Sequence, residues 1–206
     1  MIKRLFGSLP FCIVVAAICN SSAIYAQTAT GRSPGIPPGF IVDQRCDETT
    51  GNSFCAEDNI SYFGPIGQEF VPDHSKLVAV DVFVSDFGGG NGTLRLTIHA
   101  GDIYGPVLAS RDFTVTAGYW GWRYATFFPP VILNPGSLYV IQVETVGSTG
   151  NWGIVSDVRC WADTYPRGDF IRWGEHDPIC HRDLAFRTYA LKAHDGQDDD
   201  NGRQQR

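Results

Sequence analysis

The chain reads Val78-Ala79-Val80-Asp81-Val82-Phe83-Val84-Ser85 near its middle, with a valine at every second position. Side chains of a β-strand point alternately to opposite faces, so this pattern predicts a strand with one face on a hydrophobic core. A similar alternation of core-type and other residues recurs over 94–98 and 139–143. These three segments predict antiparallel strands, each with one face on the core and the other facing water.

Shorter segments rich in β-branched and aromatic residues predict further strands. They cover Gln68–Pro72, Val107–Val115, Trp122–Phe128, Asn151–Val155, Asp169–Trp173 and Leu184–Leu191. Turn-forming residues separate many of them, and we interpret Gly88–Gly92 as a flexible hairpin turn. No stretch has a sustained helical period, so we expect little helix. About eight or nine strands in roughly 130 residues predict an all-β fold, a two-sheet antiparallel β-sandwich of the jelly-roll type.

The N-terminus has the order of features of a secretory signal peptide. Lys3 and Arg4 precede a short apolar run that ends at Ile18, and small residues follow as far as Ala26. The apolar run is shorter than the about 20 residues that a membrane-spanning helix needs. We therefore predict a signal peptide over 1–26 and a mature protein that is secreted, either outside the cell or into the periplasm, without membrane insertion.

Composition divides the remainder of the chain into three parts. Glycine, proline, serine and threonine dominate 27–39, which predicts a flexible leader, and the acidic segment 193–206 predicts a disordered tail. The sandwich domain is expected between them, over 40–192. Loss of Lys3 and Arg4 leaves 14 basic residues against 22 acidic ones, a net charge of −8 with neutral histidines. Such a charge repels phosphate backbones, so we expect no nucleic-acid partner.

Four cysteines remain after removal of the signal peptide: Cys46, Cys55, Cys160 and Cys180. An even number in an exported chain predicts disulfide bonds, with three possible connectivities. Proximity in the sequence favours the pairs Cys46–Cys55 and Cys160–Cys180. Each bond would stabilise the fold by about 2–4 kcal/mol through loop entropy. The alternative is a zinc site, but the chain has no CxxC pair to start one.

Aromatic and polar residues gather in and beside the segment that the second predicted disulfide encloses. They are Trp161, Tyr165, Arg167, Asp169 and Trp173. Exposed aromatic rings stack on the C–H faces of sugars, so we predict an exposed aromatic platform there, with Arg167 and Asp169 as hydrogen-bonding neighbours. The alternative is that the rings fill the core of the sandwich. Trp120, Trp122 and Trp152 fit that core role better, because they lie on or beside predicted strands.

From Gln68 onward, the order of several short motifs resembles that of secreted bacterial jelly-roll modules of the carbohydrate-binding-like or anchor-associated kind. The motifs are Gln68–Pro72, Gly105–Leu108, Asn134–Tyr139, Tyr165–Gly168 and Asp183–Tyr189. The resemblance implies a β-sandwich fold and export. Relatives of this kind often end in a hydrophobic sorting segment, and because this chain does not, we do not expect surface anchoring.

A second polar segment offers candidate metal ligands. It contains Glu175, His176, Asp177, His181 and Asp183. Jelly-roll modules often carry a structural calcium ion, which prefers carboxylate and carbonyl oxygens. Asp81, Asp177 and Asp183 are the candidate calcium ligands, and the alternative is a solvated polar loop.

The sequence therefore predicts a secreted, non-catalytic binding module with an extracellular glycan or polysaccharide as its ligand. One alternative is a structural or adhesive protein of the extracellular matrix, and another is a hydrolase on a jelly-roll scaffold. Glycoside hydrolysis requires two carboxylates that flank the bond, which aspartates could supply. The chain has no H-E-x-x-H motif and no recognisable spacing of serine, histidine and aspartate. It offers no positive sign of catalysis.

Overall fold

The computed structural model describes residues 39–46, 54–88, 90–147, 151–157, 163–177 and 182–191, with the backbone alone of 54–56 and 157. The predicted signal peptide and tail lie outside these ranges, as does the predicted leader up to residue 38. Contacts divide the chain into the units Met1–Thr30 and Gly31–Arg206, and every described residue belongs to the second. None of the described residues form a helix that is long and apolar enough to cross a membrane.

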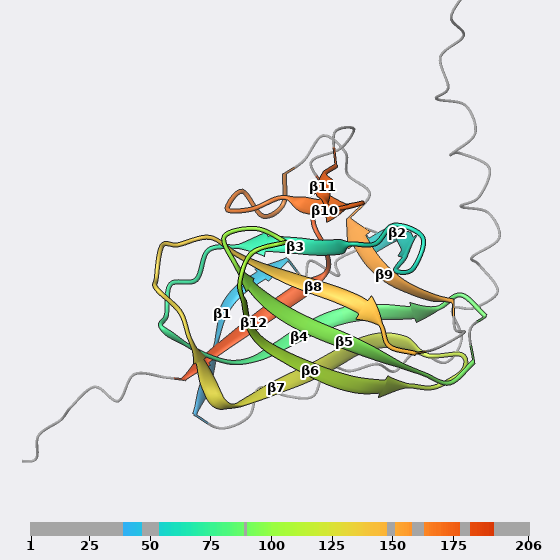
Figure 1. The fold of residues 1–206 in the computed structure, drawn as a ribbon, viewed down its shortest axis with the longest axis horizontal. Coiled ribbons are helices and arrows are strands. Elements are labelled where there is room, and N and C mark those ends of the chain that lie inside the picture. Colours follow the sequence, from blue (N-terminus) through green and yellow to red (C-terminus); the bar gives the residue numbers. More distant parts are fainter. Residues whose placement is uncertain are drawn as a thin grey trace, which may run out of the picture. The chain divides into compact units, whose positions relative to one another are not determined.

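The described residues form strands in two antiparallel sheets (Figure 1). The strands are β1 (Phe40–Cys46), β2 (Phe54–Asn59), β3 (Ile66–Phe70), β4 (Lys76–Asp86), β5 (Gly92–Ala100), β6 (Val107–Val115), β7 (Trp120–Ile132), β8 (Tyr139–Thr145), β9 (Trp152–Asp157), β10 (Phe170–Arg172), β11 (Glu175–His176) and β12 (Phe186–Leu191). Sheet A has the order β1-β12-β4-β9-β2, with β7 also paired to β4, and sheet B has the order β11-β10-β3-β8-β5-β6. The predicted all-β, two-sheet fold is confirmed, whereas the strand orders do not establish a jelly-roll topology.

The valine repeat lies on β4, at the centre of sheet A. Val80, Val82 and Val84 are fully buried and share one hydrophobic cluster with Ile98 and Ile141 of sheet B. Full burial of such a side chain contributes about 1.5–3 kcal/mol, so each of these valines helps to stabilise the packing of the two sheets. β4 pairs with β7 along one edge and with β12 and β9 along the other.

Most of the predicted strands are confirmed, with shifted ends. β6 has the predicted bounds, and β3 begins and ends two residues before the predicted strand. The strands β1, β2 and β11 were not predicted. The sequence of β2 lacks the alternation of apolar and polar residues, and β11 has only two residues, so each owes its form to its partner strand.

The glycine-rich segment 88–92 is not the predicted hairpin turn. The strand before it, β4, belongs to sheet A, and the strand after it, β5, belongs to sheet B, so the segment crosses between the sheets. Gly88 and Gly90 have φ angles of 89° and 76°, which glycine adopts without a steric penalty. The Asp86 carboxylate accepts hydrogen bonds from the backbone N–H groups of Gly88 and Gly118 and fixes the start of the crossing.

The predicted core role of three tryptophans is confirmed for two of them. Trp152 and Trp122 are buried, but Trp120 is 39% exposed, so its assignment to the core is wrong. Trp120 is the first residue of β7, at the end of the strand, where fewer neighbours cover it. Trp120 and Trp122 both meet the ring of Phe83 edge-on, each at 5.4 Å between centroids.

A short hairpin of β10 and β11 lies at one edge of sheet B and positions the residues discussed below (Figure 1). Trp173 and Gly174 form its two-residue turn, with φ angles of 53° and 77°. Positive φ at both central residues is what a type I′ hairpin turn requires, and asparagine followed by glycine is the usual pair. Trp173 is the only non-glycine residue with positive φ in the described part of the chain. Trp173 lies in this turn rather than in the strand that the sequence predicts.

Candidate functional site

Three aromatic side chains from two segments meet at the β10–β11 turn. Trp173 is 54% exposed and Tyr62 is 70% exposed, while Phe63 is partly buried beside them. The ring centroids are 4.9 Å apart for Phe63 and Trp173, 4.8 Å for Tyr62 and Phe63, and 6.4 Å for Tyr62 and Trp173. We call Tyr62, Phe63 and Trp173 the aromatic surface. It presents two large rings to solvent at one edge of the sandwich.

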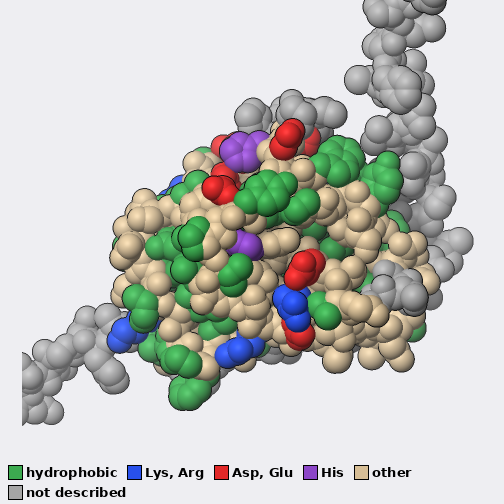
Figure 2. Space-filling view, in the orientation of Figure 1, with side chains coloured by type: hydrophobic (Ala, Val, Ile, Leu, Met, Phe, Trp, Pro, Cys, Tyr) green, Lys and Arg blue, Asp and Glu red, His purple; other side chains and the backbone are tan. Residues whose placement is uncertain are grey.

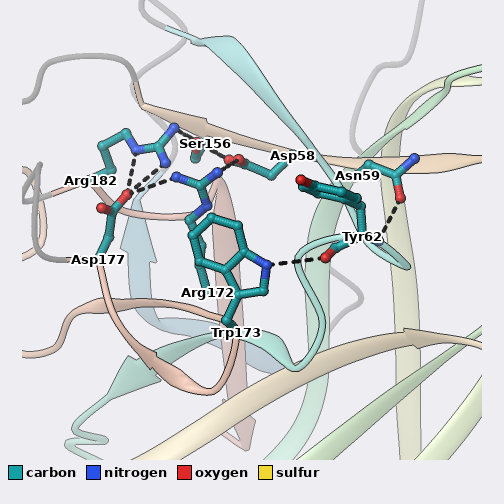
Figure 3. Close-up of polar contacts among 8 residues, drawn as sticks. All are labelled: Asp58, Asn59, Tyr62, Ser156, Arg172, Trp173, Asp177 and Arg182. Carbon is teal, nitrogen blue, oxygen red and sulfur yellow. Dashed lines mark hydrogen bonds and ion pairs between the residues drawn. The ribbon is translucent and has the colours of Figure 1, made fainter. Parts of the chain in front are cut away.

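Hydrogen bonds hold the two halves of the aromatic surface together (Figure 3). The Trp173 indole Nε1–H donates to the Tyr62 carbonyl at 3.2 Å, and the Trp173 backbone N–H donates to the Phe63 carbonyl at 2.7 Å. The Asn59 side chain accepts a hydrogen bond from the Tyr62 N–H at 2.9 Å and donates one to Asn151 at 2.8 Å. These hydrogen bonds therefore hold the backbone that carries Tyr62, Phe63 and Trp173 in place.

Tyr104 borders the other side of the hairpin. It is 71% exposed and lies in the connection between β5 and β6. A Cβ atom on Gly174 would lie only 1.8 Å from the Tyr104 hydroxyl, so a larger residue there would displace the Tyr104 side chain. Ile103 anchors the connection, because it is buried against Val140 and Ile171. Figure 2 shows hydrophobic, acidic and histidine side chains side by side in the part of the surface where β10 and β11 lie.

A closed ring of ion pairs lies directly beside Trp173 (Figure 3). Arg172 contacts Asp58 at 3.2 Å and Asp177 at 3.4 Å, and Arg182 contacts the same two carboxylates at 3.4 Å and 2.7 Å. All four side chains are largely buried. Burial raises the pKa of Asp58, while Arg182, Arg172 and a hydrogen bond from Ser156 oppose the shift. Two positive and two negative charges cancel, so the ring carries no net charge.

The ion-pair ring is joined to the aromatic surface through Arg172. Its guanidinium carbon lies 3.9 Å from the centroid of the Phe63 ring and 4.9 Å from that of Trp173. A guanidinium over an aromatic face contributes about 0.5–1 kcal/mol at exposed sites and more where water is excluded. Arg172 thus packs against the rings of Phe63 and Trp173, and its ion pair with Asp58 links them to β2.

Two carboxylates surround one imidazole on the same hairpin. His176 Nε2 lies 2.9 Å from Glu69 Oε1, and His176 Nδ1 lies 3.7 Å from Asp169 Oδ2. The Asp169 N–H donates to Glu69 Oε2 at 3.1 Å. The hydrogen bond to Glu69 is the main cause that raises the pKa of His176; burial opposes the shift, and the charges of Glu69 and Asp169 add to it. We call these residues the carboxylate–histidine cluster.

Tyr165 does not belong to an exposed platform. It is only 5% exposed, so the expectation that it is exposed is wrong. Its hydroxyl donates to Gln44 Oε1 at 3.0 Å and accepts from the Val71 N–H at 3.1 Å, and its ring meets Phe186 edge-on at 5.0 Å. Burial raises the pKa of the Tyr165 hydroxyl to about 12. Because the Tyr165 hydroxyl finds hydrogen-bond partners inside the fold, the side chain can be buried without an unpaired polar group.

The remaining predicted ligand-binding residues fall in different places. Arg167 forms an ion pair with Asp73 at 2.9 Å and a hydrogen bond to Gln44 at 3.2 Å, so it shares a partner with buried Tyr165. Asp169 joins the carboxylate–histidine cluster, and Trp173 joins the aromatic surface. Trp161 lies outside the described residues. Of the five predicted residues, only Asp169 and Trp173 are therefore found at the β10–β11 hairpin among the residues that the structure describes.

The three candidate calcium ligands contact donors or cations of the protein itself. Asp81 is fully buried, accepts a hydrogen bond from the Tyr189 hydroxyl at 2.7 Å and lies 3.8 Å from Arg187. Asp177 belongs to the ion-pair ring, and Asp183 accepts hydrogen bonds from Gln68, Thr164 and Tyr165. Within the described ranges, they do not gather into a set of metal-ligating atoms. Calcium binding by these residues stays a prediction.

The predicted disulfides fall mostly on side chains that the structure does not describe. These are the side chains of Cys55, Cys160 and Cys180. Cys46 is buried at the end of β1, and its Sγ lies 3.3 Å from Thr164 Oγ1. Both predicted pairings stay predictions.

Sequence reasoning missed Tyr62, Phe63, Tyr104 and Glu69. Tyr62 and Trp173 are 111 positions apart in the chain, and Glu69 and His176 are 107 apart. The pairing of β10 with β3 and the hydrogen bonds of Trp173 to Tyr62 and Phe63 bring these segments together. The pair Trp173-Gly174 held one usable signal, because a glycine that follows a large residue between two short strands indicates a tight hairpin turn.

No protein-family model matches the chain, and no curated protein matches its sequence. The structure confirms the coarse part of the resemblance to secreted jelly-roll modules, namely two antiparallel sheets in an all-β sandwich.

Proposed function

We propose that the protein is a non-catalytic carbohydrate-binding module, in which the aromatic surface stacks against sugar rings of an extracellular polysaccharide. The observation that carries this proposal is Trp173. Its ring is exposed, its indole N–H is fixed, and its backbone has the left-handed conformation that costs a bulky residue about 1–2 kcal/mol. Strained backbone conformations of this kind cluster at functional sites.

The chemistry of the surroundings suits a sugar. The faces of Trp173 and Tyr62 offer apolar contact to C–H groups, and the side chain of exposed Tyr104 offers a hydroxyl that can form hydrogen bonds with a sugar. Because a hydrogen bond of its indole N–H already holds the Trp173 ring, this ring loses little conformational entropy on binding. Each stacked ring contributes on the order of 1 kcal/mol, so we expect weak binding that is built from several contacts.

The test is binding of the protein from Gln27 onward to a panel of polysaccharides, by affinity gel electrophoresis and by calorimetry with the best ligand. Trp173→Asn removes the ring and supplies the residue that type I′ turns favour before glycine. We expect this variant to bind about five- to tenfold more weakly, or about 1–1.4 kcal/mol, with a melting temperature close to that of the parent. Binding should weaken because the indole ring is lost, and stability should be kept because asparagine adopts the same backbone conformation in the turn.

Trp120→Ala is the matched control, because Trp120 is also exposed but lies on sheet A. It should bind the glycan as the parent does. Retained affinity in Trp173→Asn would contradict the proposal, and so would the absence of any bound polysaccharide. Release of reducing ends from a polysaccharide would favour the hydrolase alternative, and adhesion to matrix proteins without glycan binding would favour the structural alternative.

A further inference from the structure

The carboxylate–histidine cluster has the composition of a metal site. Glu69, Asp169 and His176 each offer one ligand atom, and these three atoms lie within 4.8 Å of one another. They come from β3, from the residue before β10 and from β11. From these ligands we propose that the cluster binds one Zn²⁺ ion, a role that is independent of sugar binding by the aromatic surface.

The backbone holds the three ligands in place before any ion binds. The Glu69 N–H donates to the Asp169 carbonyl at 3.0 Å, and Ile171 pairs with His176 across the hairpin. Gly168 brings the two carboxylates together, since a Cβ atom there would lie 2.4 Å from the Glu69 carbonyl oxygen. A larger residue at 168 would push Asp169 away from Glu69. The site is therefore built into the sheet rather than assembled by a free loop.

The charge around the cluster is negative and only partly balanced. Glu69 is buried, and among the described residues neither Glu69 nor Asp169 forms an ion pair with a lysine or arginine. His176 is their shared partner, and it supplies at most one positive charge against two negative ones. This contrasts with the neighbouring ion-pair ring, where two arginines cancel two aspartates. A divalent cation would cancel both carboxylates.

The ligand types select among divalent ions. Calcium and magnesium prefer oxygen ligands alone, whereas zinc binds imidazole nitrogen and carboxylate oxygen at about 2.0–2.2 Å. Two ligands of one such ion are therefore at most about 4.4 Å apart, so the cluster needs only a small closure. His176 and Asp169 can supply that closure, because their side chains are 60% and 49% exposed. The remaining coordination positions would be taken by water.

The experiment titrates ZnCl₂ into the chelator-treated protein from Gln27 onward, by calorimetry and by the shift in melting temperature. We expect the cluster to bind one equivalent and zinc to raise the melting temperature, because an ion that binds only the folded state stabilises it. His176→Ala and Asp169→Asn should each weaken that binding at least about tenfold, because even the loss of a residue that only orients a metal ligand typically costs about 10–100-fold. Both side chains are exposed, so both variants should fold.

His74→Ala is the matched control. His74 also forms a close contact with a buried carboxylate, Asp43, but among the residues that the structure describes no third ligand completes a metal site there. This variant should bind zinc as the parent does. Equal zinc binding by His176→Ala and the parent would overturn the proposal, as would binding of CaCl₂ at the cluster with the same affinity. The outcome of this zinc experiment does not depend on whether Trp173→Asn changes glycan binding, so the two proposals can fail separately.

Discussion

Asp183 is a buried carboxylate at the centre of a hydrogen-bonded network. Its oxygens accept from the Gln68 amide, from the backbone and hydroxyl of Thr164, and from the Tyr165 N–H. All of these donors fit the ionised carboxylate, yet burial outweighs them and raises its pKa to about 6. The carboxyl therefore gives up its proton less readily in the folded protein than in the unfolded chain. This difference makes the stability of the fold depend on pH.

We predict that the free energy of unfolding falls as the pH rises from about 4 to about 6. In this interval the folded state keeps a proton on Asp183 that the unfolded chain, with a pKa of 3.8, has already lost. The stability that the protonated form supplies is complete below pH 3.8 and is lost as the pH passes 6. The loss amounts to no more than about 3 kcal/mol for this one group. Urea denaturation at several pH values measures it.

Asp183→Asn provides the comparison, because the amide does not ionise. Its free energy of unfolding should change less over the same interval, so the difference between variant and parent should vary most between about pH 4 and 6. Parallel pH curves for the two proteins would show that other groups cause the change. The variant itself is expected to be less stable, since its amide N–H₂ faces the Gln68 donor.

Single residues were predicted well only where local chemistry decides their position. Trp173 was expected at the surface and is exposed, because the turn that holds it is local. Tyr165 has the same aromatic character in the same segment, but its hydroxyl finds Gln44 and Val71 inside the fold. Those partners lie far away in the sequence. No property of the segment around Tyr165 distinguishes the two outcomes.

The β10–β11 hairpin is too short to be stable alone, so its neighbours hold it. A two-stranded hairpin in water is marginal at best, and this one pairs only Ile171 with His176 and Arg172 with Glu175. The ion-pair ring supplies a firm attachment, since it joins β10 to β2 and to the segment before β12. The contribution of the ion-pair ring to the free energy of unfolding can be measured by removing one of its charges and then removing an opposite charge as well.

We predict that Arg182→Met lowers the free energy of unfolding by about 3–5 kcal/mol. The substitution leaves Asp58 and Asp177 with only one of the two arginines of the ring, so a buried negative charge is no longer balanced. The double variant Arg182→Met with Asp58→Asn restores neutrality. It should lose less stability than the sum of the two single variants, by at least about 1 kcal/mol. Urea denaturation of the four proteins completes the cycle.

Arg95→Met is the control for a salt bridge outside the ring. Arg95 contacts Asp112 at 2.7 Å, but both side chains are exposed. Its loss should cost no more than about 1 kcal/mol, because water screens the pair. Additive effects of Arg182→Met and Asp58→Asn would show that the ring is not coupled.

At the level of elements, alternation predicted the central strands and failed at the edges. The strands β4, β5 and β8 have alternating apolar residues on the core, so their period of two is visible in the sequence. The prediction that the other face of β4 meets water is wrong, because Ala79 and Asp81 on that face are fully buried. β2 and β11 form because a partner strand offers hydrogen bonds, and that partner is not visible locally. The hairpin turn predicted at 88–92 was wrong for the same reason, namely that strand pairing is not visible locally. The glycines indicated that the strand ends there, but not that the next strand belongs to the other sheet.

The two-sheet architecture was predictable for the whole molecule because burial of apolar faces decides it. The valines of β4 need a second apolar face, and Leu94, Leu96 and Ile98 of β5 help to supply it from sheet B. The candidate site follows a different rule. Its residues come from the loop after β2, from β3, from the β5–β6 connection and from the β10–β11 hairpin, and only the folded topology brings them together.

At the scale of the whole molecule, the predicted export of the chain has a consequence for its cysteines. We predict that the protein from Gln27 onward has no free thiol, because its four cysteines are even in number and an exported chain meets an oxidising environment. Two closed loops would add about 2–4 kcal/mol each, so reduction should lower the melting temperature. Alkylation without reductant, followed by mass spectrometry, should label no cysteine. Peptide mapping should give Cys46–Cys55 and Cys160–Cys180. Cys46 lies beside Thr164, close in sequence to Cys160, so a Cys46–Cys160 peptide is the result that would contradict this pairing.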